Sequence, residues 1–349
     1  MDVESLSRSE LCALSRDPSV LAVAPIVPVR LAQPAEIGAV DSALPWGREV
    51  VGAGATSFTG RGVTLAMLDS GIDAAHEVFS GVDLVERDFT GGGNRDDHGH
   101  GTHAAAIAIG RRVGDTQIGV APGIERLLAA KVVDANGRGT TDGFLRGLLW
   151  ALEGHARIVF FAVELDIETF IGELDLPGAA ALRAGLEAYR ANLYMLDALT
   201  SLARDNALFV AGAGNDSQRE VDGRFEVSAT LPACAGGVIA VGALERHRGL
   251  LRAAAFSNSL PQIAAPGADI LSARAGGGLV GMSGTGTAAA HVAGVAALWW
   301  EALRETAHPK LTSAVLNKLL SAATSDSLFP GDDVAERGLG LIRAPINGA

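Results

Sequence analysis

The chain has 349 residues, of which 48% are hydrophobic and 19% charged, so it can bury a sizeable core and is not disordered by composition. Its 28 Lys and Arg residues against 40 Asp and Glu residues give a formal net charge of −12. That charge argues against nucleic acid and anionic membranes as partners, because both attract basic patches. The two cysteines, Cys12 and Cys234, lie far apart without a CxxC spacing, so we expect neither a disulfide framework nor a zinc site.

The beginning of the chain predicts a small leading unit, residues 1–45, before a main domain, residues 46–349. In the leading unit, residues 6–14 predict a helix, and residues 19–31 predict a strand whose prolines suit the edge of a sheet. No basic region followed by an apolar run is visible, and no apolar stretch approaches the ~18 residues of a membrane span. These features predict a cytoplasmic protein, or a secreted one if a leader has been removed.

A continuous apolar run at residues 63–68 is typical of a central parallel strand, and Asp69 stands at its carboxyl end. Open α/β sheets place their chemistry at that edge. A lone aspartate after a strand is more often a turn or cap residue, so a catalytic role for Asp69 is indicated only in combination with the motifs that follow.

A Gly-rich loop leads into the run HGHGTH at residues 98–103, which opens a predicted helix. Three histidines invite a metal hypothesis. The spacing differs from the HExxH helix of zinc proteases, and no glutamate lies between the histidines, so we expect no metal here. We expect His98 and His103 to pack or to form hydrogen bonds.

The middle of the chain holds a Gly-rich edge, an apolar strand and an acidic insert. The edge is GRGTT at residues 137–141, which precedes a predicted helix. The run FFAVE at residues 160–164 ends in Glu164, and a mixed apolar and charged region follows, with helical periodicity over residues 179–194. We expect this insert, about residues 164–200, to form either a surface helix pair or a platform for a partner or substrate.

Two further stretches place polar residues next to a predicted strand or helix. The buried strand predicted at residues 207–215 finishes in a Gly-rich turn and Asn215, where asparagine is commonly a left-handed turn residue. The glycines lack the full GxGxxG spacing and the following helix, which excludes a dinucleotide fingerprint. At residues 281–300 a Gly/Ser/Thr-rich turn runs into small and apolar residues at helical spacing. This pattern predicts either a close-packed core helix or a helix N-terminus that holds an anion or a nucleophile.

In this order, the aspartate after a strand, the HGTH run and the Ser/Thr-rich helix start resemble the motifs of the subtilisin-like serine peptidases, the subtilases, over residues 60–325. The resemblance implies an α/β fold with three layers: a doubly wound, mostly parallel sheet with helices on both faces. It implies that Asp69 is the orienting aspartate, His100 the general base and Asn215 the amide of the oxyanion hole.

The nucleophilic serine of this family is missing. The family motif reads SGTSMA and then PHVAG, whereas this chain reads SGTGTA at residues 283–288 and AHVAG at residues 290–294, so the serine falls on Gly286. Glycine has no side-chain oxygen, and therefore no acyl-enzyme can form at this position. We expect the neighbouring Thr285 and Thr287 to project in other directions.

The resemblance also implies a peptide-binding groove. Gly137, Arg138 and Gly139 match the strand edge that pairs with a bound peptide through backbone hydrogen bonds. Glu164 replaces a small glycine on the strand that lines the pocket for the residue before the scissile bond. Its side chain would intrude on that pocket or recharge it. Thr285, beside the missing nucleophile, is a further expected substrate-binding residue.

Where some subtilases place asparagine-rich calcium ligands, this chain has Arg111, Arg112 and Val113. Two cations and an apolar residue cannot supply oxygen ligands, so we expect no calcium at that loop, no other metal and no cofactor.

The sequence favours a pseudoprotease that keeps the groove and binds peptide or protein without cleaving it. One alternative is an active endopeptidase disabled at residue 286. Another is a non-catalytic partner that docks a second enzyme through residues 164–200. A flavodoxin-like ligand binder would need a phosphate loop, which the sequence lacks. Residues 1–45 resemble the end of a subtilase propeptide, which makes this segment a candidate ligand of the groove; the alternative is an N-terminal strand with no regulatory role.

Overall fold

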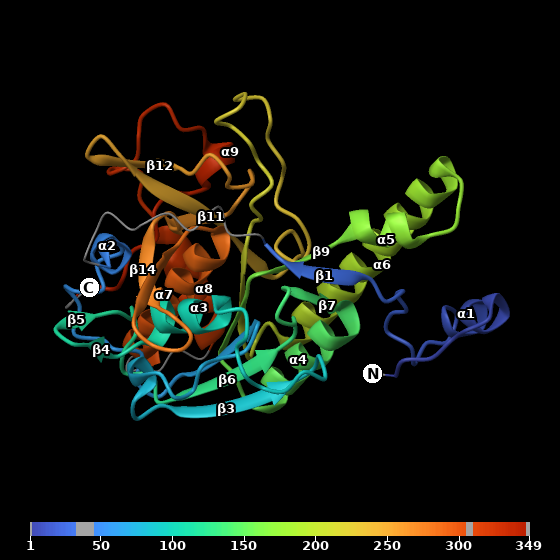
Figure 1. Ribbon diagram of the computed structural model, residues 1–349, viewed down its shortest axis with the longest axis horizontal. Coiled ribbons are helices and arrows are strands. Elements are labelled where there is room, and N and C mark those ends of the chain that lie inside the picture. The colour runs from blue at the N-terminus through green and yellow to red at the C-terminus, as the bar shows by residue number, and fades with distance from the viewer. Residues whose placement is uncertain (1, 33–44, 305–309, 347–349) are drawn as a thin grey trace.

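The computed structural model describes residues 2–32, 45–304 and 310–346 (Figure 1). At its centre is an eight-stranded sheet in the order β12-β11-β10-β8-β2-β6-β3, with β13 also paired to β11. Within this sheet only the pairing of β11 with β12 is antiparallel. The strands are β2 (Thr64–Asp69), β3 (Asp83–Asp88), β6 (Arg126–Lys131), β8 (Ile158–Phe161), β10 (Leu208–Gly212), β11 (Val238–His247), β12 (Leu250–Ala253) and β13 (Ile263–Pro266).

The two faces of the sheet belong to two separate apolar clusters. Along β2, Leu65 and Met67 point into one cluster while Ala66 and Leu68 point into the other, as the two-residue repeat of a strand requires. The first cluster is closed by helices from one side of the sheet, and the second by helices from the other (Figure 1). The helices that cover the first face are α3 (His100–Ile109), α7 (Thr285–Arg304) and α8 (Leu311–Ser321), and those on the second face are α4 (Thr141–Glu153) and α6 (Gly178–Ala203). The expected three-layer, doubly wound α/β fold is confirmed.

The parallel strands bring their carboxyl ends to one edge of the sheet. β2 ends at Asp69, and β10 ends at Gly212, just before Asn215. Helix α3 begins at His100, and α7 begins at Thr285. The fold therefore gathers four stretches that are far apart in sequence at the edge where open α/β sheets place their sites.

A second, three-stranded sheet lies beside this edge. It consists of β1 (Pro28–Leu31) between β7 (Arg138–Thr140) and β9 (Val163–Leu165), with β1 antiparallel to both. The expectation that the prolines place this strand at an edge is wrong, because β1 is the central strand. Pro28 is tolerated as its first residue, a position where strands accept proline. The predicted strand is also shorter than expected, since only four residues of the predicted 19–31 form it.

The insert folds as a helix pair, α5 (Ile167–Glu173) and α6, and α6 is longer than the pattern over residues 179–194 predicted. Figure 1 shows this pair projecting from the body of the molecule. Its base touches the leading unit, because Asp166 N donates to Pro28 O at 2.8 Å and Asn192 Nδ2 donates to Pro25 O at 3.1 Å. The insert therefore borders the strand β1 as well as solvent.

The remaining elements are short. Helix α1 (Arg8–Leu14) starts with a capping box formed by Ser7 and Glu10, close to the predicted helix at residues 6–14. Residues 33–44 of the proposed leading unit lie outside the described residues. The other elements are α2 (Trp46–Val50), the 3-10 helix η1 (Glu77–Phe79), β4 (Arg112–Val113), β5 (Thr116–Gln117), β14 (Ile270–Ala273), β15 (Leu279–Met282) and α9 (Val334–Arg337). Among the helices of the described ranges, none combines the length and apolar character needed to cross a lipid bilayer.

Candidate functional site

Asp69 and His100 form a buried pair at the carboxyl edge of the sheet. Both carboxylate oxygens of Asp69 lie 2.9 Å from His100 Nδ1, and Ser70 N donates to Asp69 Oδ1 at 2.7 Å. Burial alone would lower the pKa of His100. The negative charge of Asp69 and its hydrogen bond, with a further contribution from Asp96, outweigh that effect and raise the pKa of His100 above its ordinary value. The pair holds the imidazole in one orientation and favours its charged form.

Asp96 anchors the start of α3, and the sequence analysis did not single it out. Its carboxylate accepts hydrogen bonds from Gly99 N at 2.7 Å, from Thr102 N at 2.8 Å and from Thr102 Oγ1 at 2.6 Å. It also accepts one from Ser70 Oγ at 2.8 Å, which ties the loop after β2 to α3. An acidic residue just before a helix start is the signal that could have identified it. Asp96 thus fixes the position of the first turn of α3, which carries His100.

The other two histidines of the HGHGTH run have different surroundings. His103 is completely buried, its Nε2 lies 2.9 Å from Ile270 O, and burial lowers its pKa to about 3. The ring of His98 stands edge-on to that of His100, with 6.5 Å between the ring centroids. Throughout the described part of the chain, no group of three or more His, Cys, Asp or Glu side chains is arranged to hold a metal ion.

Asn215 directs its side-chain amide at the carbonyl of Ala32. Asn215 Oδ1 accepts hydrogen bonds from Thr285 N at 2.9 Å and from Thr285 Oγ1 at 3.0 Å. This leaves Nδ2 to donate to Ala32 O at 3.3 Å. Thr285 is completely buried, and its hydroxyl also accepts from Gly214 N at 3.1 Å. The expected substrate-binding residue Thr285 therefore orients Asn215 through its side chain.

Gly286, the second residue of α7, lies against the ring of His100. An ideal Cβ at this glycine would stand 3.1 Å from both Nε2 and Cε1 of His100. It would also stand 2.6 Å from Cβ of Ala162, which is closer than two carbon atoms can pack without displacement. The space next to the imidazole is therefore fitted to a residue without a side chain.

The three hydroxyl groups around Gly286 are bonded elsewhere. Ser283 Oγ accepts from Asp269 N at 2.9 Å. Thr287 Oγ1 donates to Gly284 O at 2.6 Å, and the hydroxyl of Thr285 serves Asn215 as described above. These contacts hold each hydroxyl in its own local network.

The groove between β7 and β9 is filled by the chain's own β1. Leu31 N donates to Gly137 O at 2.8 Å, and Ala32 N donates to Ala162 O at 3.0 Å. In the backbone register, Val29 faces Gly139 and Arg30 faces Arg138. The structure thus brings the predicted edge at residues 137–139 against residues 29–31, and this strand delivers the Ala32 carbonyl to Asn215.

Glu164 is a buried partner of that strand. Its Oε1 lies 2.7 Å from Arg30 Nε, and Thr230 Oγ1 donates to its Oε2 at 3.2 Å. Only 4% of Glu164 is exposed. Burial, and next the charge of Asp216, raise the pKa of Glu164 to about 6, although Arg30 and Thr230 act in the opposite direction. The structure thus places the Glu164 side chain in an ion pair with Arg30, two residues before Ala32.

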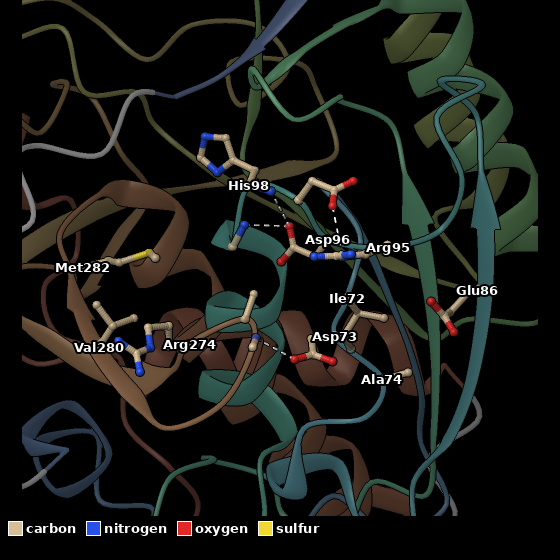
Figure 2. A pocket seen from close by; sticks show the side chains of 14 residues that line it. Ile72, Asp73, Ala74, Glu86, Arg95, Asp96, His98, Arg274, Val280 and Met282 are labelled. Carbon is tan, nitrogen blue, oxygen red and sulfur yellow. Dashed lines mark hydrogen bonds and ion pairs between the residues drawn. The ribbon is translucent and has the colours of Figure 1, made fainter.

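A cavity of about 730 Å³ lies beside the start of α3 (Figure 2). Charged side chains of both signs line it, among them Asp73 and Arg274, and Asp73 Oδ2 accepts from Gly276 N at 2.8 Å. His98 and Met282 also contribute to its wall. The lining residues come from outside β1, β7 and β9, so the cavity is distinct from the groove that holds residues 28–32.

Comparisons with known proteins agree with this arrangement. The model of the subtilase family of peptidases matches residues 60–340. A subtilisin-like protease of Coccidioides posadasii is 34% identical over 244 residues, which cover 69% of this chain and 53% of the relative. Subtilisin-like protease 1 of Trichophyton rubrum is 32% identical over 295 residues, covering 81% of this chain and 51% of the relative. The chain thus spans about half the length of these curated relatives.

Proposed function

Because the chain belongs to the subtilase family, we propose that it is a pseudoprotease, which binds an extended peptide or protein segment in the groove of that fold without cleaving it. The observation that carries the proposal is Gly286, which lies against the imidazole of His100 where a nucleophile would have to stand. Three parts of a subtilase site have their counterparts in Asp69, His100 and Asn215, and the attacking oxygen has none.

The missing oxygen removes the first chemical step. In a serine peptidase the histidine accepts the proton of the hydroxyl group that attacks the carbonyl, the aspartate stabilises the imidazolium, and amide groups bind the oxyanion. Here His100 is oriented by Asp69, and Asn215 reaches a carbonyl oxygen, so groups for proton transfer and charge stabilisation are in place. Without a hydroxyl at residue 286, no covalent bond to that carbonyl can form.

The packing around Gly286 supports glycine as the residue to which the surrounding structure is adapted. A side chain there would meet Ala162 Cβ at 2.6 Å, so a serine needs a shift of the backbone at Ala162 or at the start of α7, both of which are buried. The bonded hydroxyls of Ser283, Thr285 and Thr287 argue against a substitute nucleophile.

The occupied groove supports the binding half of the proposal. Backbone hydrogen bonds to β7 and β9 hold residues 28–32 in an antiparallel three-stranded sheet, a mode of peptide recognition that adds a strand to a sheet edge. The Ala32 carbonyl accepts a hydrogen bond from Asn215, so in our proposal it stands for the carbonyl that an active subtilase would attack. The peptide bond after Ala32 stays intact, and the N-terminal segment acts as a ligand in cis.

A second candidate is an active endopeptidase for which a serine belongs at residue 286. The contacts of Asp69 with His100 and of Asn215 with Ala32 favour it, because they keep the geometry that catalysis requires. A third candidate is a docking protein for another enzyme. It is favoured by Leu182 and Leu186, which lie one turn apart on α6 and are 54% and 62% exposed.

Restoring the hydroxyl tests the proposal. We would compare the wild type with Gly286→Ser, and with Ala162→Gly/Gly286→Ser, which also removes the methyl group that a serine would meet. Ala162→Gly alone is the matched control. The readouts are hydrolysis of a broad peptide library and an intact-mass spectrum that reports cleavage after Ala32.

We expect the wild type to hydrolyse no peptide of the library and to show no cleavage after Ala32. Cleavage by the wild type would overturn the proposal. Strong cleavage by Gly286→Ser alone would favour the disabled endopeptidase. Silence of Gly286→Ser together with activity of the double variant would show that the site is packed around glycine, as a pseudoprotease requires.

A further inference from the structure

An arginine of β1 lies against an acidic cluster in the groove, of which Glu164 is buried and Asp166 and Asp216 are half-buried. Arg30 Nε donates to Glu164 Oε1 at 2.7 Å, and Arg30 Nη2 donates to Asp216 Oδ1 at 3.0 Å. The charge of Asp166 also acts on Arg30. Glu164, Asp166 and Asp216 form what we call the acidic subsite, and two of its carboxylates contact the same guanidinium.

The acidic subsite is electrostatically unfavourable when no cation occupies it. Glu164 is 4% exposed, and apart from Arg30 its carboxylate accepts a hydrogen bond from Thr230. A buried carboxylate that loses its counter-charge keeps the cost of dehydration without the compensating attraction. It would also face the like charge of Asp216, which together with burial already raises the pKa of Glu164 to about 6. The subsite therefore penalises a strand that brings no cation.

The backbone register decides which residue of a bound strand meets the subsite. Arg30 pairs directly with Glu164, and its neighbours Val29 and Leu31 are buried in the apolar cluster on the other face of the strand. Side chains alternate along a strand, so only every second residue reaches the acidic face. A strand whose carbonyl is held by Asn215 as Ala32 is held presents the residue two positions earlier to the subsite.

We propose that the groove selects extended peptide strands that carry a basic residue, arginine above all, two positions before the carbonyl bound by Asn215. This inference rests on the proposed function, because it takes the groove to be a binding site for a strand. Arginine is preferred to lysine because its planar fork of donors contacts Glu164 and Asp216 at once. Neutral and acidic residues are rejected because they would leave the carboxylates of Glu164 and Asp216 without a counter-charge.

Hydrogen exchange of the full-length chain tests the subsite in cis. The amides of Leu31 and Ala32 donate across the groove, so their protection reports docking of β1. We expect Arg30→Gln and Glu164→Gln each to speed their exchange about tenfold, and Arg30→Lys to have a smaller effect. The double variant Arg30→Gln/Glu164→Gln is expected to exchange no faster than either single variant. Arg252→Gln, which removes a different Arg–Glu pair on the main sheet, is the matched control.

Two outcomes distinguish failure of the acidic subsite from failure of the proposed function. Equal exchange in the wild type and Arg30→Gln would overturn the acidic subsite while leaving strand binding intact. Rapid exchange of Leu31 and Ala32 in the wild type would overturn both the subsite and the proposed function.

Peptides test the selectivity in trans. The probe is the heptapeptide Ile-Val-Pro-Val-Arg-Leu-Ala, the sequence of residues 26–32, compared with the same peptide carrying citrulline, a neutral isostere of arginine. Both are titrated into full-length Arg30→Gln, in which the competing β1 is weakened. We expect the arginine peptide to bind about tenfold more tightly. Equal affinities, or binding of neither peptide, would overturn the proposal for strands supplied in trans.

Discussion

The side-chain amide of Asn215 lies 3.3 Å from the carbonyl oxygen of Ala32, and the two residues are joined across 183 positions of sequence. The amide is aimed by Thr285, whose backbone N–H and hydroxyl both donate to Asn215 Oδ1. In the proposed function this amide is the counterpart of an oxyanion-hole donor, and it is held against a carbonyl in a site where Gly286 takes the place of the nucleophile.

Removing the Asn215 amide should loosen the docked strand. Asn215→Ala leaves the Ala32 carbonyl without this donor, at a cost of about 1 kcal/mol, so the amides of Leu31 and Ala32 should exchange about fivefold faster. Thr285→Val should act in the same direction, because it removes a contact that aims Asn215. Gln117→Ala, which deletes a side-chain amide bonded far from the groove, serves as control. Unchanged exchange in both groove variants would contradict this prediction.

The charge of Asp69 should set the ionisation of His100. With Asp69 present the pKa of His100 is raised, because the carboxylate outweighs burial. In Asp69→Asn the burial effect is no longer opposed by that charge, so the pKa of His100 should fall below its ordinary value of about 6.5. The measurement is an NMR titration of the imidazole protons. Asp97→Asn, a nearby exposed carboxylate, should leave the titration unchanged.

Two buried histidines should make the fold sensitive to acid. Burial lowers the pKa of His103 to about 3 and that of His291 to about 4. Both values lie below the unfolded value of about 6.5, so the stability that these neutral side chains contribute is present above pH 6.5 and is lost as the pH falls toward 4 and 3. At pH 4.5 the combined loss is on the order of 5 kcal/mol.

Urea unfolding at pH 7 and pH 4.5 measures this loss. We expect His291→Gln to reduce the difference between the two pH values, whatever its effect on stability at pH 7. The control is His155→Asn at an exposed position with φ of +60°, a conformation that asparagine tolerates. The same pH slope in His291→Gln and the wild type would refute the assignment.

Two helical glycines should respond to alanine in opposite directions. At Gly101, in the first turn of α3, an added Cβ would stand 2.1 Å from the backbone oxygen of Gly71, so Gly101→Ala should destabilise the fold by about 3 kcal/mol. At Gly172 in α5 no atom lies within 4 Å of the added Cβ. There, alanine should stabilise by about 0.5–1 kcal/mol through helix propensity. Thermal or urea unfolding compares the two, and similar losses in both variants would contradict the packing at Gly101.

Much of the fold could be predicted from local sequence patterns. The apolar run before Asp69, the Gly/His turn at the start of α3 and the small-residue helix α7 each predict a local element, and their resemblance to the subtilase motifs implies the doubly wound sheet. The glycine at residue 286 was equally visible, because it stands inside a motif. These features depend on residues that are neighbours along the chain.

Other features required the tertiary structure. The sequence placed the strand of residues 19–31 at an edge because of its prolines, whereas β1 is central because β7 and β9 leave a gap between them. The hydrogen bond by which Asp96 joins Ser70, 26 residues away, could not be predicted from either local motif.

By itself, the sequence determined which family the motifs resemble, and through that resemblance the fold, and it determined that residue 286 has no side-chain oxygen, because motifs are made of residues that are neighbours along the chain. Only the tertiary structure decided that Arg30 would meet Glu164, 134 residues away, and that Ala162 would stand where a side chain at residue 286 would need room. Contacts of that kind depend on how separate strands and helices cross, and no local periodicity encodes the crossing.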